Sequence, residues 1–119
     1  MPAYRQVRTR VSSMTDFDPW ASVRRFSAHL DEVNGTSEHE LALRLLKLSE
    51  EVGEVTAAYI GMVGQNPRKG VTHTREDVAE ELCDVMITAM VALCSFADEP
   101  ELALRRKIEK VDARYLDAS

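Results

Sequence analysis

Two pairs of acidic residues in this sequence have the spacing of ligands on one side of a helix. Glu51 and Glu54, in the segment KLSEEVGEV, are three residues apart, and Glu81 and Asp84 repeat that spacing. Residues three apart on a helix lie one above the other, about 4.5 Å along the axis. If two helices that carry these pairs pack antiparallel, the four carboxylates face one another and can bind one ligand.

The ligand that such a cluster would bind is a divalent cation. Two carboxylates ~4 Å apart repel by about 4 kcal/mol at an effective dielectric constant near 20, and a cation removes that repulsion. Oxygen ligands alone suit Mg²⁺, with Mn²⁺ as a second candidate. A di-iron carboxylate bundle uses a histidine three residues after a glutamate. None of His29, His39 and His73 has a glutamate at that position, so iron is not expected.

The competing interpretation is that these acids only solvate helix surfaces, as a single glutamate-rich turn usually does. The metal site is favoured because both pairs adjoin apolar stripes and no acid in them has a lysine four residues later. Lys47 precedes Glu51 by four residues, which is the less favourable order for a helical ion pair. Lys47 is therefore predicted to bind a substrate phosphate.

Four helices are predicted to position these residues, and no strand pattern recurs. Capping residues and helical periodicity place them at Pro19–Asn34, at Glu38 to about Val63, from the Thr74 cap to about Ala97, and from Pro100 onward. The second helix has an apolar seam at Leu41, Leu45, Leu48, Val52, Val55, Tyr59 and Met62. The third is apolar on nearly all sides, which predicts burial against a second subunit.

The predicted fold class is therefore all-α, a four-helix bundle-like fold completed by oligomerisation as a homodimer or homotetramer. Residues 1–15 are predicted to be a disordered basic arm, residues 16–119 a single domain, and residues 64–74 a loop. The net charge of −5 argues against binding polymeric nucleic acid, and no apolar run is long enough to cross a membrane. Cys83 and Cys94 lie about 16 Å apart along one predicted helix, too far for a disulfide, which favours a reducing, cytoplasmic location.

The acidic pattern also resembles that of a known family. The order E-E-x-x-E, 26 residues, then E-x-x-D is similar to that of the all-α nucleoside triphosphate pyrophosphohydrolases, the MazG-like superfamily. The flanking segments KLSEEVGEV and AEELCDVM resemble that family as well, and the similarity spans roughly residues 40–116.

The resemblance implies a Mg²⁺-dependent enzyme that hydrolyses a (d)NTP between its α- and β-phosphates, giving (d)NMP and pyrophosphate, in nucleotide-pool house-cleaning. It implies that Glu51, Glu54, Glu81 and Asp84 are the metal ligands. Glu50 matches an additional acid of the first motif, and we predict a catalytic role for it in orienting or deprotonating the attacking water.

Further substrate-binding residues are predicted on the outer helices. Lys107, Lys110 and Arg114 share one side of the last helix, where the family often has lysines and an arginine; many members have asparagine where this chain has Val111. Trp20 is predicted to stack on the base, although its helical spacing also fits a core position. Two alternatives stay open: a non-catalytic helical dimerisation or regulatory module, and a relative that acts on a specialised nucleotide of the phosphoribosyl-ATP type.

Overall fold

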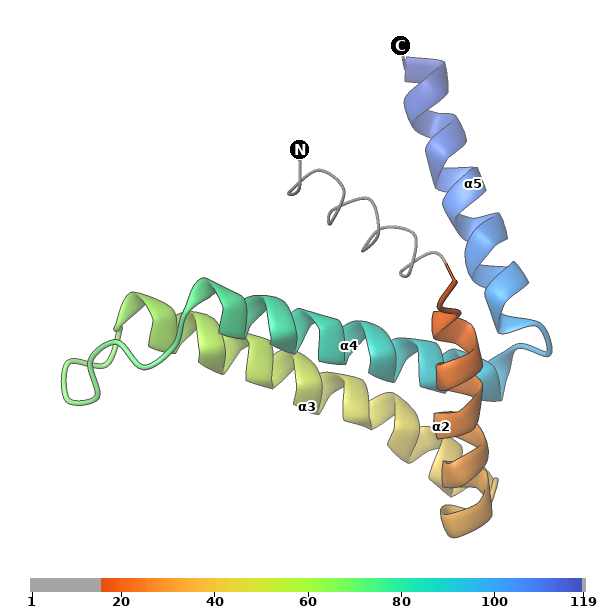
Figure 1. Cartoon of the computed structure of the whole chain (residues 1–119), viewed down its shortest axis with the longest axis horizontal. Coiled ribbons are helices and arrows are strands. Elements are labelled where there is room, and N and C mark those ends of the chain that lie inside the picture. Colours follow the sequence, from red (N-terminus) through yellow and green to blue (C-terminus); the bar gives the residue numbers. More distant parts are fainter. Residues whose placement is uncertain (1–15, 119) are drawn as a thin grey trace, which may run out of the picture.

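A computed structural model describes residues 16–118, which form four helices and no strand (Figure 1). The helices are α2 (Pro19–Asn34), α3 (Glu38–Val63), α4 (Arg75–Phe96) and α5 (Pro100–Ala118). The prediction of an all-α fold is confirmed, and the helix bounds agree closely with those expected from the capping residues. The predicted arm at residues 1–15 lies outside the described residues, as does position 119.

The helices begin where side chains can satisfy their first backbone N–H groups. The Asp18 side chain accepts a hydrogen bond from the backbone of Trp20, and the Ser37 side chain accepts one from the backbone of Glu40. Thr74 and Asp77 form a complete capping box at the start of α4. Glu40 does not complete the box at α3, because its carboxylate binds Asn34 and Arg44 instead.

α3 and α4 form a long antiparallel hairpin, and α2 crosses one end of it (Figure 1). Trp20 and Val23 of α2 are buried against Val91 of α4 in the small core at that end. At the other end, the backbone N–H of Thr72 donates to the Gly61 carbonyl. A side chain at Gly61 would collide with Thr72 and His73, so glycine allows the loop to pack against α3. Both ends of the hairpin are thus fixed.

The face that α3 turns toward α4 differs from the predicted apolar seam. Three predicted seam residues, Leu45, Val52 and Tyr59, are about half exposed, at 46%, 50% and 55%. The other four seam residues, Leu41, Leu48, Val55 and Met62, are half buried, and they share the inner side of α3 with Arg44, Glu51 and Ala58. On α4, Glu81, Thr88 and Ser95 likewise lie on the inner side beside Val78, Val85 and Val91. The hairpin interface is therefore partly polar, and part of the apolar surface of each helix points outward.

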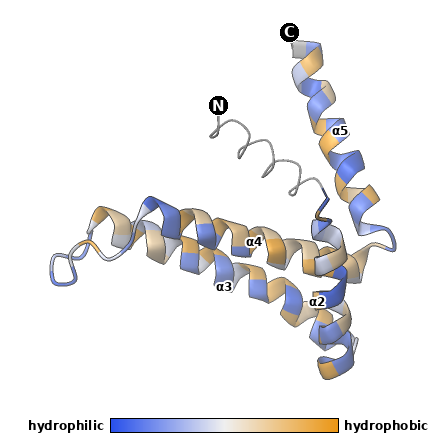
Figure 2. Cartoon of the chain, in the orientation of Figure 1, coloured by the Kyte–Doolittle hydropathy of each residue, from blue (hydrophilic) through white to orange (hydrophobic). Residues whose placement is uncertain are grey.

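α5 extends away from the hairpin rather than closing a four-helix bundle (Figure 1). Its main contacts are with α4, and Arg24 of α2 pairs with Glu101 near its start; several of its apolar residues are exposed, including Ile108 at 58%. Figure 2 shows hydrophobic positions along the length of this separated helix. The radius of gyration is 18.6 Å, compared with about 13.5 Å for a compact domain of this length. The predicted packing of the last helix does not occur within one chain.

None of the four described helices is long and apolar enough to span a membrane. Cys83 and Cys94 are both free thiols, as expected from their separation along α4.

Candidate metal centre and adjoining cavity

The predicted acidic residues come together at the middle of the α3–α4 hairpin. Glu51 contributes from α3, and Glu81 and Asp84 contribute from α4; one carboxylate oxygen of each lies within 4.8 Å of the others. Glu54 lies outside this tightest group, but its carboxyl group interacts with both Glu51 and Glu81. The i,i+3 spacing on two antiparallel helices therefore brings all four acids to one place.

The cluster is electrostatically unfavourable when both helices carry charged acids. Partial burial raises the pKa of the Glu51 carboxyl, and the nearby Glu54 carboxylate raises it further. The same two causes, in the same order, raise the pKa of the Glu81 carboxyl, with Asp84 adding a smaller effect. The Glu51 and Glu81 carboxyls therefore favour their neutral forms more than an isolated glutamate does, as expected for partly buried acids with like charges nearby.

The donor set fits a hard divalent cation. All of its ligand atoms are carboxylate oxygens, and the Oε2 atom of Glu81 is buried without a hydrogen-bond partner among the described residues. A buried acceptor without a donor is unfavourable in a folded protein. A cation at this position would satisfy that oxygen and neutralise the repulsion among the acids, and oxygen ligands of this kind suit Mg²⁺.

Lys47 lies beside the cluster, one helical turn from Glu51. Its Nζ is 2.9 Å from a carboxylate oxygen of Glu50 and 3.9 Å from one of Glu51. The hydrogen bond to Glu50 is the largest cause of the raised pKa of Lys47. Glu50 itself is 58% exposed and points to Lys47, so it borders the cluster without joining it.

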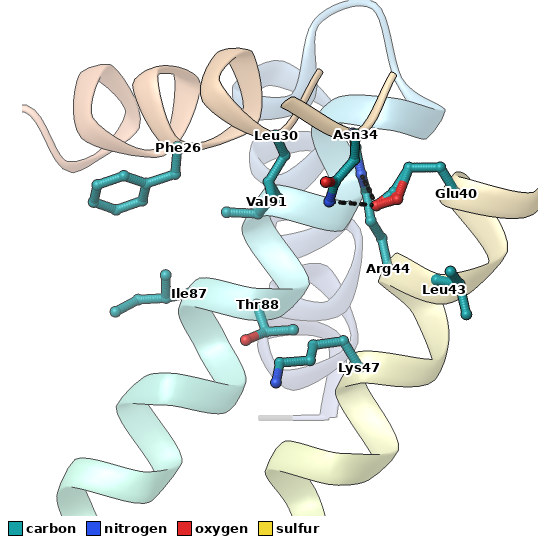
Figure 3. A pocket seen from close by; sticks show the side chains of 10 residues that line it. All are labelled: Phe26, Leu30, Asn34, Glu40, Leu43, Arg44, Lys47, Ile87, Thr88 and Val91. Carbon is teal, nitrogen blue, oxygen red and sulfur yellow. Dashed lines mark hydrogen bonds and ion pairs between the residues drawn. The ribbon is translucent and has the colours of Figure 1, made fainter. Parts of the chain in front are cut away.

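A cavity of about 420 Å³ adjoins the acids, between α2, α3 and α4 (Figure 3). Its lining includes Lys47, one turn from Glu51 on α3, and Thr88, one turn from Asp84 on α4. The lining is mainly apolar, with polar groups at both ends; its ten residues are Phe26, Leu30, Asn34, Glu40, Leu43, Arg44, Lys47, Ile87, Thr88 and Val91. This size and character are those of a small-molecule site.

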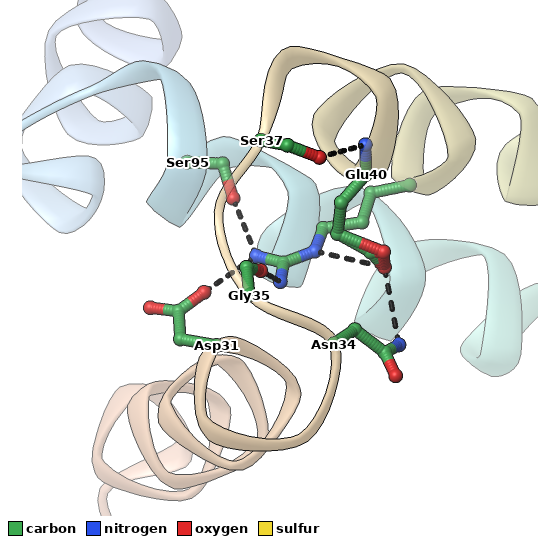
Figure 4. Close-up of polar contacts among 7 residues, drawn as sticks. Asp31, Asn34, Gly35, Ser37, Glu40 and Ser95 are labelled. Atoms are coloured by element: carbon green, nitrogen blue, oxygen red, sulfur yellow. Dashed lines mark hydrogen bonds and ion pairs between the residues drawn. The ribbon is translucent and has the colours of Figure 1, made fainter.

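Arg44 holds the three helices together behind this cavity. Its side chain is 5% exposed, and it donates to the Asp31 carboxylate at 2.7 Å, to the Ser95 hydroxyl at 3.0 Å and to the Gly35 carbonyl at 3.0 Å. Glu40 lies 3.7 Å from its Nε. Figure 4 shows these partners converging from α2, the following turn, α3 and α4. Arg44 therefore fixes the position of α2 over the hairpin.

The structure corrects the prediction for Trp20. The ring is 9% exposed and packs in the core with Val23 and Val91, which leaves it no open face for a base. The helical pattern allowed this outcome, because core and surface aromatic residues have the same spacing.

The predicted phosphate-binding residues of the last helix do not meet the acids within one chain. Lys107, Lys110 and Arg114 are exposed on α5, which runs away from the hairpin. Any contact between these cations and the acidic cluster would have to come from a second copy.

Sequence reasoning missed Arg44 and Asn34. The available signal for Arg44 was a charged residue at the apolar edge of the second helix, between Leu41 and Leu48. Asn34 carried no signal, because an asparagine before glycine is an ordinary helix end.

Comparisons of this chain with known protein families, with curated proteins and with solved structures find no match.

Proposed function

We propose that this protein is a Mg²⁺-dependent nucleoside triphosphate pyrophosphohydrolase, with Mn²⁺ as a possible substitute. The observation that carries the proposal is the convergence of Glu51, Glu81 and Asp84, whose ligand oxygens lie within 4.8 Å, with Glu54 beside them. The adjoining cavity supports it, because the rest of a nucleotide needs space next to its phosphates. The MazG-like resemblance supplies the reaction and a house-cleaning role in the cytoplasm.

The four acids would hold the cation, which would supply neutralisation of the triphosphate and acidification of the attacking water. The chain's own residues position the reaction. Lys47 can turn from Glu50 toward a phosphate oxygen, since its side chain is half exposed. That movement releases the Glu50 carboxylate, which can then orient the water or accept its proton.

The test is a panel of canonical and modified (d)NTPs with Mg²⁺, with separate assays for pyrophosphate and for phosphate. We expect pyrophosphate and a monophosphate as products. Glu81→Gln should lose activity by at least about 100-fold, the scale seen when a preorganised electrostatic group is removed. Glu80→Gln is the matched control, because it changes an exposed glutamate on the same helix and should leave the rate unchanged.

Three other results would contradict parts of this proposal. Release of single phosphates would show that the enzyme cleaves a bond other than the one between the α- and β-phosphates. Turnover confined to a nucleotide of the phosphoribosyl-ATP type would favour the specialised relative. A protein that binds Mg²⁺ but hydrolyses no nucleotide would favour the non-catalytic helical module.

The proposed enzyme is at least a homodimer, and a homotetramer is compatible with the same surfaces. The support is the outward apolar face of the hairpin, which exposes Leu45, Val52 and Tyr59, and Leu82 and Met86 of α4 at 48% and 64%. Contiguous apolar surface of this kind marks an interface. A second copy is also the remaining source of α5 cations for the acidic cluster, because α5 of the same chain runs away from the hairpin.

Sedimentation or light scattering measures the oligomeric state directly. Ile108→Glu, on the exposed apolar side of α5, should shift the mass toward the monomer. Glu109→Gln is its control and should leave the mass unchanged. A monomeric parent protein at micromolar concentration would rule out the dimer.

A further inference from the structure

We infer that the cavity between α2, α3 and α4 receives the base of the nucleotide, and that Asn34 selects bases carrying an exocyclic amino group. This inference rests on the proposed function, because it assigns the phosphates to the acidic cluster. It concerns a different set of residues, which can be altered without touching the metal ligands.

The position of the cavity matches the shape of a nucleotide. Lys47 and Thr88 line its near end, and each is one helical turn from an acid of the cluster. Glu40 and Asn34 line its far end. Glu40 precedes Glu51 by 11 residues on α3, which is roughly 16 Å along the axis. A nucleotide with its phosphates at the acids would extend its base toward Asn34.

The orientation of the Asn34 amide is fixed by its neighbours. A carboxylate only accepts hydrogen bonds, so the Glu40 carboxylate requires the NH₂ group of Asn34, and the bond from Nδ2 to Glu40 is 3.1 Å long. The Nε of Arg44 lies 3.7 Å from the same Glu40 oxygen and, as its ion-pair partner, helps to hold that carboxylate in place. In Figure 4 the Asn34 nitrogen points to Glu40 and the oxygen points away from it.

The Asn34 carbonyl oxygen is therefore left as an acceptor. It receives no hydrogen bond from any residue between 16 and 118. An acceptor at the end of a base site pairs with an amino group of adenine or cytosine and repels the oxo group that replaces it in hypoxanthine or uracil. The chain from Arg44 through Glu40 to Asn34 thus converts a flexible amide into a defined hydrogen-bond acceptor.

An aromatic side chain also lines the cavity. Phe26 is 48% exposed and lines the cavity, and Figure 3 shows its ring at one end near Ile87. Phe26 is eight residues before Asn34 on α2, roughly 12 Å along the axis. It therefore forms an apolar wall of the cavity, while Asn34 distinguishes among the bases.

The experiment compares matched substrate pairs, CTP with UTP and ATP with ITP, which differ by an amino group in place of an oxo group. We expect kcat/KM to favour the amino member by about tenfold in each pair, the size expected for one hydrogen bond against an unpaired acceptor. Binding of CMP and UMP without metal, followed by NMR at the Asn34 side-chain amide, gives a second readout independent of turnover.

Two variants test the mechanism of selection. Asn34→Ala should bring the two members of each pair to within about twofold of one another, because the acceptor is gone. Glu40→Gln gives Asn34 a partner that both donates and accepts, so its amide can turn and the preference should weaken or reverse. Glu38→Gln, an exposed change in the same helical turn, should keep the parent preference.

The outcomes separate this inference from the proposed function. Hydrolysis of all four nucleotides with equal kcat/KM would overturn base selection and leave the pyrophosphohydrolase in place. Hydrolysis of none would overturn the proposed function together with this inference. If Phe26→Ala changed the oligomeric mass but not the substrate preference, a second copy would occupy the cavity, and the inference would be wrong.

Discussion

Replacing Arg44 by methionine should destabilise the protein more than any other single charge removal on α3. Methionine keeps the length and apolar stem of the side chain but removes the guanidinium. The variant then leaves the Ser95 hydroxyl and the Gly35 carbonyl without their donor, and removes the charge beside Glu40, whose side chain is 12% exposed. The Asp31 side chain is 44% exposed and can bind water in place of Arg44, so losing the ion pair between Arg44 and Asp31 adds little to the cost.

The expected cost follows from these contacts. Two hydrogen bonds from a charged donor to neutral acceptors contribute about 1.5 kcal/mol each. The uncompensated Glu40 carboxylate brings the total to about 3–5 kcal/mol, the range for breaking a buried ion pair from one side. At about 4 °C per kcal/mol for a domain of this size, the melting temperature should fall by roughly 12–20 °C.

Thermal and urea unfolding followed by circular dichroism measure this change, at one protein concentration because the proposed dimerisation would contribute to stability. Arg24→Met is the matched control. Arg24 pairs with Glu101 at 3.1 Å, but both side chains are about half exposed, so its loss should cost less than about 1 kcal/mol. Equal destabilisation by the two variants, or a change below about 1 kcal/mol for Arg44→Met, would refute the assignment of Arg44 as the buried anchor.

Three further predictions concern the hairpin. The pKa values of Glu51 and Glu81 are raised in the folded protein, so just above their ordinary pKa of 4.5 the folded protein binds more protons than the unfolded chain. The free energy of unfolding of the metal-free protein should therefore fall as the pH rises through that window. Scanning fluorimetry should accordingly show a larger stabilisation by Mg²⁺ near neutral pH than near the ordinary pKa, and an equal response would contradict a carboxylate site. Gly61→Ala should cost about 1–3 kcal/mol by forcing Thr72 off α3, measured by urea unfolding. Gly53→Ala meets no atom within 4 Å in one chain and should stabilise α3 by about 0.5–1 kcal/mol; a loss of stability would indicate close approach of a second copy there.

The helices and the acidic cluster were predictable from the sequence because both depend on local periodicity. Asp18, Ser37 and Thr74 are side chains that cap helices by short-range hydrogen bonds, and each begins a helix in the structure. The acids follow from the same geometry, since three-residue spacing fixes neighbours on a helix whatever surrounds it. Only their convergence needed an assumption, the antiparallel packing of two adjacent helices.

The rotation of the hairpin was not predictable in this way. Apolar periodicity finds the most apolar face of a helix, and that face was assigned to the contact between α3 and α4. In the structure the contact is shifted toward the adjacent side of α3, with Arg44 opposite Ser95; this keeps Leu48 half buried and leaves Leu45 and Val52 outside. Apolar periodicity alone does not decide which neighbour an apolar face will meet. For the same reason, the sequence pattern of Trp20 fitted a base-binding surface as well as the core, and the prediction chose the surface.

The rotated packing explains how a repulsive cluster can persist in a folded hairpin. With the fully apolar faces together, Glu51 and Glu81 would lie at the edge of the interface and could separate into water. In the observed register they are partly buried at its centre, while the hairpin is fixed at one end by Arg44 and Ser95 and at the other by Gly61 and Thr72. Those two attachments oppose the charge repulsion between them. The acids are thereby held close together, an arrangement that would lower the reorganisation needed to bind the proposed cation.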